Sequence, residues 1–288
     1  MGEHSLNKKQ GITSLRIKRI LITIVLILIS IMCLFWFVLL FVNTTRSNGE
    51  LGRGFTLIPS THLITNIKNL YEGTIPILNG MFNSFVVAGL SALLCVYFST
   101  MTAYAVQMYT FKGKKAIITF ILAIMMIPTQ VTALGFINLV SALGLENNFI
   151  PLIIPSIAAP VTFFYMKQYM ASNLPPSLIE AARIDGAGEL KTFNLIALPL
   201  MKPAIAVQAI FTFVASWNNY FVPSLILHDD TKKTLPVLIA QLRSADWLKF
   251  DMGQVYAMIS FSIFPVIIVY LILSKNIVGG TTAGGVKE

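Results

Sequence analysis

The chain has 288 residues, of which 56% are hydrophobic and only 11% are charged. Soluble domains are typically about one quarter charged, so this composition excludes an ordinary soluble protein and favours a membrane protein. The net charge of +9 would suit nucleic-acid binding. However, the cations follow a membrane topology and nothing else in the sequence supports a nucleic-acid partner, so we expect none.

Six apolar runs reach the length of about 20 residues that a helix needs to cross a bilayer. None has a charged residue at its centre, and we therefore expect an all-α polytopic membrane protein with six transmembrane helices. The runs cover residues 20–42, 81–108, 116–140, 150–170, 203–226 and 254–274.

The runs divide the chain into five parts. Residues 1–19 form an N-terminal segment, and 20–42 the first transmembrane helix, which is longer than the apolar part of a signal peptide and has no cleavage site after it. Residues 43–78 form an outside segment with a short interfacial helix. A core of five transmembrane helices covers 79–274, and a tail rich in Gly and Thr, expected to be extended, covers 275–288.

The positions of Lys and Arg predict the orientation. With a cytoplasmic N-terminus, the inner segments carry 14 Lys and Arg against 5 acidic residues, and the outer segments carry 7 of each. The whole positive excess then lies on one side, which predicts that both termini are cytoplasmic. The outer segment at 228–251 is too long for a simple turn, and we expect it to face an external partner.

The sequence offers no metal or disulfide site. Cys33 and Cys95 both fall in predicted spans, and the three histidines lie in separate segments. We therefore expect neither a disulfide framework nor a metal centre.

The spans also bear on the energy source. Ion-coupled transporters commonly use ionisable side chains within the membrane, and these spans have none at depth. Sodium coupling through carbonyls and hydroxyls remains open. The nearest approach to a phosphate-binding loop, at 280–285, lacks the lysine that such a loop requires. If ATP drives this protein, a separate subunit must bind it.

The polar residues within the spans are uncharged amides and hydroxyls. This favours a pathway for a neutral, hydroxyl-rich solute, although hydrogen bonds between helices would explain each of them equally well. The candidate pathway residues are Gln130, Asn138, Gln208, Trp217, Asn218 and Asn219.

The stretch 180–203 is longer than a connection between two spans needs to be. Ser177 and Glu180 have the spacing of a capping box, which predicts the start of a helix. A second helix is expected from Glu189, with Leu190, Phe193, Ile196 and Leu200 on one face. Small residues at the corner between the helices would allow a partner to approach closely. They are Ala181, Ala182, Gly186, Ala187 and Gly188. An inert loop is the alternative.

The same stretch resembles the loop E-A-A-x3-G-x9-I-x-L-P of the membrane subunits of bacterial ABC importers. The matching residues are Glu180, Ala181, Ala182, Gly186, Ile196, Leu198 and Pro199, and Asp185 lies within the pattern. The resemblance implies that the loop at 180–199 contains the coupling helix, which sits in a cleft of a separate ATP-binding subunit. It also implies that 79–274 is the ABC permease core.

Further motifs are similar to the sugar-importer branch, specifically its smaller six-span permease of the maltose and multiple-sugar type. They lie at 83–88, 217–223, 234–236 and 280–284. The resemblance implies a non-enzymatic permease of the bacterial plasma membrane that imports an oligosaccharide or related sugar. Its partners would be a second permease, two ATP-binding subunits and an external solute-binding protein. No cofactor is expected on this chain, and ATP and Mg would bind the ATPase subunits. The alternatives are a polyol, glycerol phosphate or another solute, or an ion-coupled secondary transporter.

Overall fold

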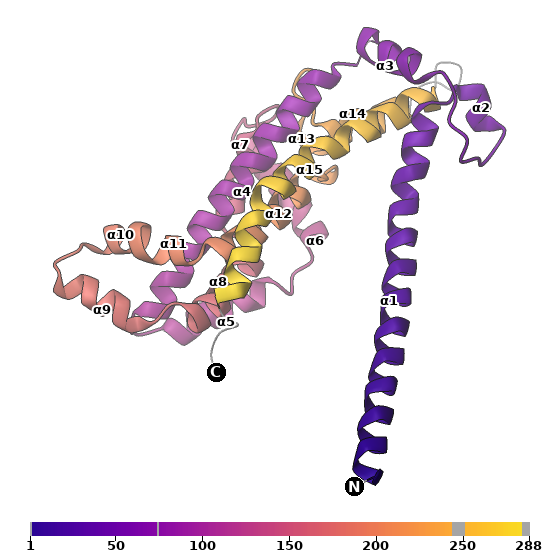
Figure 1. Ribbon diagram of the computed structural model, residues 1–288. Coiled ribbons are helices and arrows are strands. Elements are labelled where there is room, and N and C mark those ends of the chain that lie inside the picture. Colours follow the sequence, from indigo (N-terminus) through magenta and orange to yellow (C-terminus); the bar gives the residue numbers. More distant parts are fainter. Residues whose placement is uncertain (1, 74, 244–250, 284–288) are drawn as a thin grey trace. The chain divides into compact units, whose positions relative to one another are not determined.

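The computed structural model describes residues 2–73, 75–243 and 251–283, and every regular element within these ranges is a helix (Figure 1). This confirms the predicted all-α class. The helices are α1 Gly2–Thr44, α2 Asn48–Gly52, α3 Leu63–Glu72, α4 Ile77–Met108, α5 Lys114–Ile124, α6 Thr129–Ala142, α7 Ile150–Ile153, η1 Ile154–Ile157, α8 Pro160–Asn173, α9 Pro176–Ile184, α10 Glu189–Thr192, η2 Phe193–Ala197, α11 Leu198–Leu200, α12 Lys202–Trp217, α13 Phe221–Ile226, α14 Leu235–Arg243 and α15 Met252–Ala283.

Four helical stretches among the described residues are long and apolar enough to cross a membrane. The number is five if the bent pair Glu189–Leu200 and Lys202–Trp217 is counted as one span. The predicted span over 116–140 is not one continuous helix, because α5 ends at Ile124 and α6 begins after Pro128. Proline has no N–H to donate and disfavours helical backbone in the residue before it. The predicted helix over 203–226 is also interrupted, between α12 and α13. The number of six membrane crossings therefore stays a prediction.

One compact unit comprises the chain up to Glu72 together with Asp251–Ser260. The expected short helix of the outside segment is confirmed as α3. Its Asn66 amide donates hydrogen bonds to the backbone carbonyls of Thr44 and Arg46, both at 2.9 Å. The hydroxyls of Thr44 and Ser260 lie 2.7 Å apart. These contacts make the segment that follows α1 a folded part of the protein.

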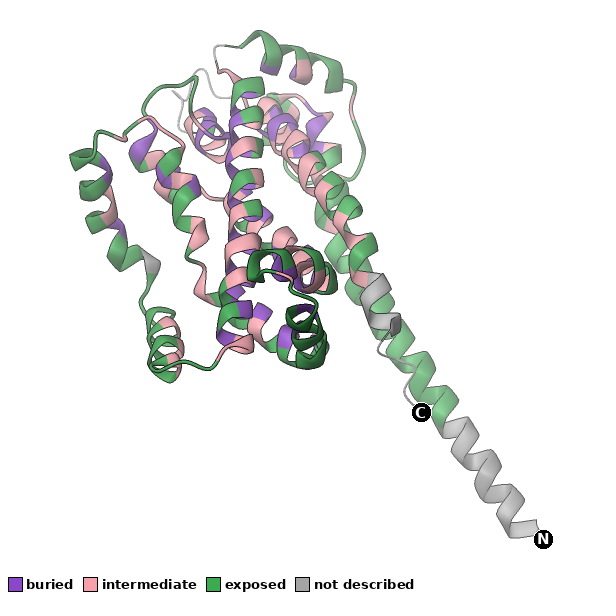
Figure 2. Cartoon of the chain, turned by 90° about the vertical axis from the view of Figure 1, so that its left-hand side faces the viewer, coloured by how far each residue is buried: buried purple, intermediate pink, exposed green. Residues whose placement is uncertain are grey.

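The second unit comprises Gly73–Phe250 and Phe261–Glu288, and its central helix is α4. Helices α12 and α8 pack along α4, and Figure 2 shows buried residues spread along most of it. Small residues at these contacts let helix backbones approach closely. The buried alanines are Ala88, Ala92 and Ala103 on α4, and Ala204 and Ala206 on α12.

The C-terminal segment differs from the expectation. Helix α15 continues to Ala283, so the prediction of an extended tail is wrong over 275–283, and 284–288 lie outside the described residues. Extending an existing helix costs far less than nucleating one, so the long apolar helix continues through the Gly and Thr residues.

Candidate functional site

Helix α9 forms the first arm of the predicted coupling loop. It begins at Pro176 with Pro175 as N-cap, and its start has no side-chain cap hydrogen bond. Proline suits the first helical position because its fixed φ matches the helix. Ser177 therefore lies within the first turn, and the predicted capping box with Glu180 is wrong. Glu180 is instead exposed on the helix surface.

Gly186 ends this arm in a left-handed conformation, with φ of 77°. The Gly186 N–H donates to the Arg183 carbonyl at 3.0 Å, and the Ala187 N–H donates to the Ala182 carbonyl at 2.9 Å. These bonds satisfy carbonyls that the helix end leaves without partners. A Cβ at Gly186 would meet no atom of this chain within 4 Å. The glycine is thus required for its backbone conformation, and the space around it is open.

The second arm is less regular than expected. A π-helical turn, η2, follows α10, and the segment Glu189–Leu200 meets α12 at an angle of 81°. Phe193 is buried, but Leu190 and Leu200 are 69% and 42% exposed, so the single apolar face predicted for this arm is wrong. The extra residue of a π turn shifts the register of the side chains after it.

Glu189 connects the two arms of the loop to the end of α4. Its carboxylate accepts a hydrogen bond from the Arg183 guanidinium at 2.9 Å and one from the Tyr104 hydroxyl at 3.3 Å. The Arg183 guanidinium lies over the ring of Tyr109, 5.0 Å from its centre. We call Tyr104, Tyr109, Arg183 and Glu189 the loop clamp. It fixes the corner of the loop against the membrane-spanning helix α4.

The hydrogen bonds of the loop clamp also change proton affinities. The hydrogen bond from Tyr109 has the largest effect and that from Arg183 the next largest, and both lower the pKa of the Glu189 carboxyl below its ordinary value. The bond to Glu189 is the main cause that raises the pKa of Arg183. Both side chains are therefore charged at neutral pH. Sequence reasoning missed the clamp because about 80 residues separate the tyrosines from their partners, and no local spacing indicates the contact.

The predicted coupling residues divide into two groups. Ala182 is buried, and Ile196 and Leu198 are half-buried, so these three hold the loop together. The exposed members are Glu180, Ala181, Asp185, Gly186 and Pro199. The second group is the more accessible to a partner, and the role of each residue in coupling stays a prediction.

The predicted pathway residues are not brought together in one place. Gln208 is buried between helices and accepts a hydrogen bond from the Thr162 hydroxyl at 3.3 Å. The Cys95 thiol donates to Thr162 at 3.4 Å. Trp217 is 2% exposed and stacks on Phe213 with ring centres 5.7 Å apart. Gln208 and Trp217 thus make the contacts expected of residues that join helices.

The remaining candidates are more accessible. Asn219 lines a cavity of about 240 Å³ with Thr132 and Phe136 of α6. Three others are exposed: Gln130, Asn138 and Asn218. The structure thus brings Asn219 to α6, the helix that carries Gln130 and Asn138, and the part of each in solute passage stays a prediction.

The structure thus joins a bent, irregular loop to a bundle of helices, several of which are long and apolar enough to cross a membrane. The model of the family described as binding-protein-dependent transport system inner membrane component matches residues 96–280. The chain belongs to this family and is the permease subunit of an ABC importer, a multi-pass inner-membrane protein.

Individual relatives match over nearly the whole chain. The arabinooligosaccharides transport system permease protein AraQ of Bacillus subtilis (strain 168) is 34% identical, covering 93% of this chain and 96% of the relative. The trehalose/maltose transport system permease protein MalG of Thermococcus litoralis is also 34% identical, covering 94% and 98%. A chain of a bacterial ABC transporter that imports the acidic polysaccharide alginate has a similar fold, with a TM-score of 0.78, 23% identity and coverage of 91% and 97%.

Proposed function

We propose that this permease imports an oligosaccharide or related sugar and that ATP hydrolysis on separate subunits drives it. It would pair with a second, homologous permease, two ATP-binding subunits that hold ATP and Mg, and an external solute-binding protein. Both termini would be cytoplasmic. When the ATP-binding subunits close, the 180–199 loop would move with them and turn the spans from inward-facing to outward-facing.

The exposed apolar corner of the loop carries this proposal. Ile184, at the end of α9, is 87% exposed, and Leu190 on the second arm is 69% exposed. Between them lies the open space around Gly186. Apolar side chains that extend from a short polar loop gain free energy when a partner covers them, at about 25 cal/mol per Å² of buried area. A cleft on an ATP-binding subunit would provide that cover.

Ile184→Asp should impair assembly with the ATP-binding subunits and leave insertion of the permease into the membrane unchanged. A carboxylate at the proposed contact would lose the apolar burial and would be costly to desolvate, so the ATP-binding subunits should no longer co-purify with the permease. The matched control is Ile64→Asp, because Ile64 is 78% exposed on α3 and lies outside the loop. Both variants should reach the membrane at normal levels. Normal co-purification and uptake with Ile184→Asp would refute the assigned contact.

The solute class follows from the relatives, whose names specify arabinooligosaccharides and trehalose or maltose. Uptake by the assembled complex in vesicles, with its binding protein outside, tests it. The panel should include arabinotriose, maltotriose, trehalose, sorbitol and glycerol 3-phosphate. We expect uptake of at least one sugar, dependent on ATP. Uptake of only a non-sugar would contradict the solute class, and uptake driven by an ion gradient without ATP would contradict the mechanism.

A further inference from the structure

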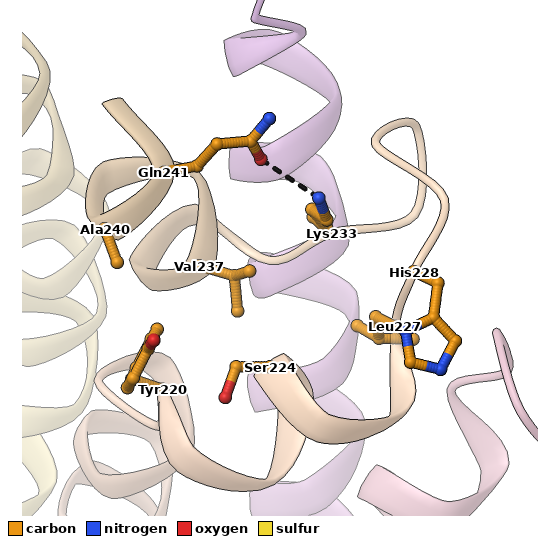
Figure 3. Close-up of a pocket in the computed structure, with 8 residues that line it drawn as sticks. All are labelled: Tyr220, Ser224, Leu227, His228, Lys233, Val237, Ala240 and Gln241. Carbon is orange, nitrogen blue, oxygen red and sulfur yellow. Dashed lines mark hydrogen bonds between the residues drawn. The ribbon is translucent and has the colours of Figure 1, made fainter. Parts of the chain in front are cut away.

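A second cavity, of about 380 Å³, lies between α13 and α14 and the chain that connects them. Figure 3 shows Tyr220 and Ser224 on one side, Gln241 on the other, and His228 and Lys233 on the connection. Pockets that bind small molecules have volumes of about 300–1,000 Å³, so this cavity has room for one or two sugar rings. We call it the α13–α14 pocket.

The connection that forms one wall of the pocket is held in place by α4. The Asn83 amide donates hydrogen bonds to the backbone carbonyls of Thr231 at 2.9 Å and Lys233 at 3.1 Å. The neighbouring Ser84 hydroxyl accepts from the Leu235 N–H at 2.8 Å. Asn83 and Ser84 are both buried, so they form a fixed anchor for the connection.

A second anchor, Asn147, holds the start of the connection. The Asn147 side chain accepts hydrogen bonds from the backbone N–H groups of His228 at 2.6 Å and Asp229 at 2.9 Å. The wall is therefore formed before any ligand arrives. A preformed wall reduces the conformational entropy that is lost on binding, because the site is already ordered.

The chemistry of the lining suits a neutral ligand with many hydroxyls. The only cation, among the described lining residues, is Lys233, and it is already paired with the Asp230 carboxylate and with the Gln241 carbonyl oxygen. The Ser224 hydroxyl donates to the Phe221 carbonyl at 2.8 Å, which leaves its oxygen able to accept. The ring of Tyr220 is 48% exposed and offers an apolar face. Sugar rings present both hydroxyls and C–H faces.

We propose that the α13–α14 pocket is a binding site on this permease for a terminal ring of the imported sugar. The proposal rests on the proposed function and deepens it by assigning a site. The Tyr220 ring would stack on the sugar's C–H face, and the side chains of Ser224, His228 and Gln241 would contact its hydroxyls.

Protection of an introduced cysteine tests the site directly. Ala240 lines the pocket, so Ala240→Cys in a Cys33→Ala background places a thiol there. The purified complex in nanodiscs, without binding protein, is labelled with a polar maleimide, and the rate is followed by mass. The imported sugar should slow labelling several-fold, and a sugar that is not imported should not. Tyr71→Cys is the matched control, since Tyr71 is 74% exposed on α3.

A second variant confirms the place of binding. Ser224→Trp added to Ala240→Cys should fill the pocket and remove the protection by sugar. An unchanged labelling rate at millimolar imported sugar would overturn the proposal, as would protection of Tyr71→Cys to the same extent. Protection by sugar-free binding protein with none by sugar would show a protein-docking surface instead, and would also overturn it. Uptake is measured on the same complexes, so import without protection refutes only the pocket, whereas absence of sugar import refutes the proposed function.

Discussion

The coupling loop and the interior of the helical bundle satisfy their polar groups in different ways. In the loop, the charged pair Arg183 and Glu189 is partly exposed and is supported by tyrosine side chains from the end of α4. Within the bundle, the hydrogen-bonded chain of Cys95, Thr162 and Gln208 is uncharged.

The cost of burying charge explains this difference. An ionised side chain within a bilayer costs several kcal/mol, whereas a hydrogen-bonded amide or hydroxyl is tolerated. If the importer draws its energy from ATP, as proposed, its spans need no titratable group for ion coupling. The hydrogen-bonded chain at Gln208 is therefore uncharged, whereas the Arg183–Glu189 pair lies in the loop, where water remains within reach and where we place the contact with the ATP-binding subunits.

Among changes to the loop's backbone and to the loop clamp, replacement of Gly186 should have the largest effect. Gly186→Ala places a side chain on a backbone with φ of 77°, and a left-handed residue costs about 1–2 kcal/mol. If the loop leaves this conformation, the coupled state should fall about 5- to 30-fold in population. ATP-dependent uptake measures this loss.

Gly188→Ala is the matched control, because φ of Gly188 is −67° and a Cβ there also meets nothing within 4 Å. Its uptake should stay near that of the parent. Equal losses in both variants would mean that backbone conformation is not what Gly186 provides.

Glu189→Gln should have a smaller effect, because it removes charge and keeps a hydrogen-bond acceptor. Partly exposed ion pairs contribute little, so we expect a measurable fall in the sugar imported per ATP hydrolysed, but of no more than about fivefold. Lys191→Gln, an exposed change in the same helix, is the control and should leave the ratio unchanged. A normal ratio in both variants would show that the loop clamp does not transmit motion.

The pH dependence of the loop clamp provides a separate readout. The pKa of Glu189 is lowered by folding from an ordinary value of 4.5. Its contribution to stability is therefore fully present above that ordinary pKa and is lost as the pH falls through the lower folded value. The thermal stability of Glu189→Gln should converge with that of the parent in that acidic range. A constant difference at all pH values would contradict the assigned ionisation.

The sequence was sufficient to predict the all-α class and the family, whereas the coupling role of the 180–199 loop stays a prediction. Apolar runs of membrane length and the gap-free E-A-A-x3-G pattern are local signals, so no tertiary contact is needed to recognise them. The predicted start of α9 was wrong because Pro176 and Ser177 both favour the start of a helix. The helix begins at Pro176, so Ser177 is not its N-cap. The break within the run 116–140 follows from Pro128, which the sequence places in the middle of an apolar stretch.

Contacts between distant segments could not be predicted in this way. Glu189 reaches Tyr104, and Asn83 reaches Thr231, only because α4 passes beside both segments. The motif at Asn83 and Ser84 was recognised, but its physical role as an anchor for the 231–235 chain came from the structure. A single sequence shows which side chains are present, but not which of them contact one another across the fold.

Gln208 tests the contrast between the loop and the bundle through the smallest expected effect. Its contacts to Thr162 are those of a residue that joins helices, and such hydrogen bonds contribute about 0.6 kcal/mol on average within membranes. Gln208→Ala should therefore lower the thermal stability of the complex slightly and leave the apparent affinity for sugar unchanged. Asn219→Ala is the informative comparison, because Asn219 lines the cavity beside α6 and should alter rate or sugar preference. A changed sugar preference in a fully assembled Gln208→Ala complex would place the pathway along the Cys95–Thr162–Gln208 chain, and would show that the neutral interior serves transport as well as packing.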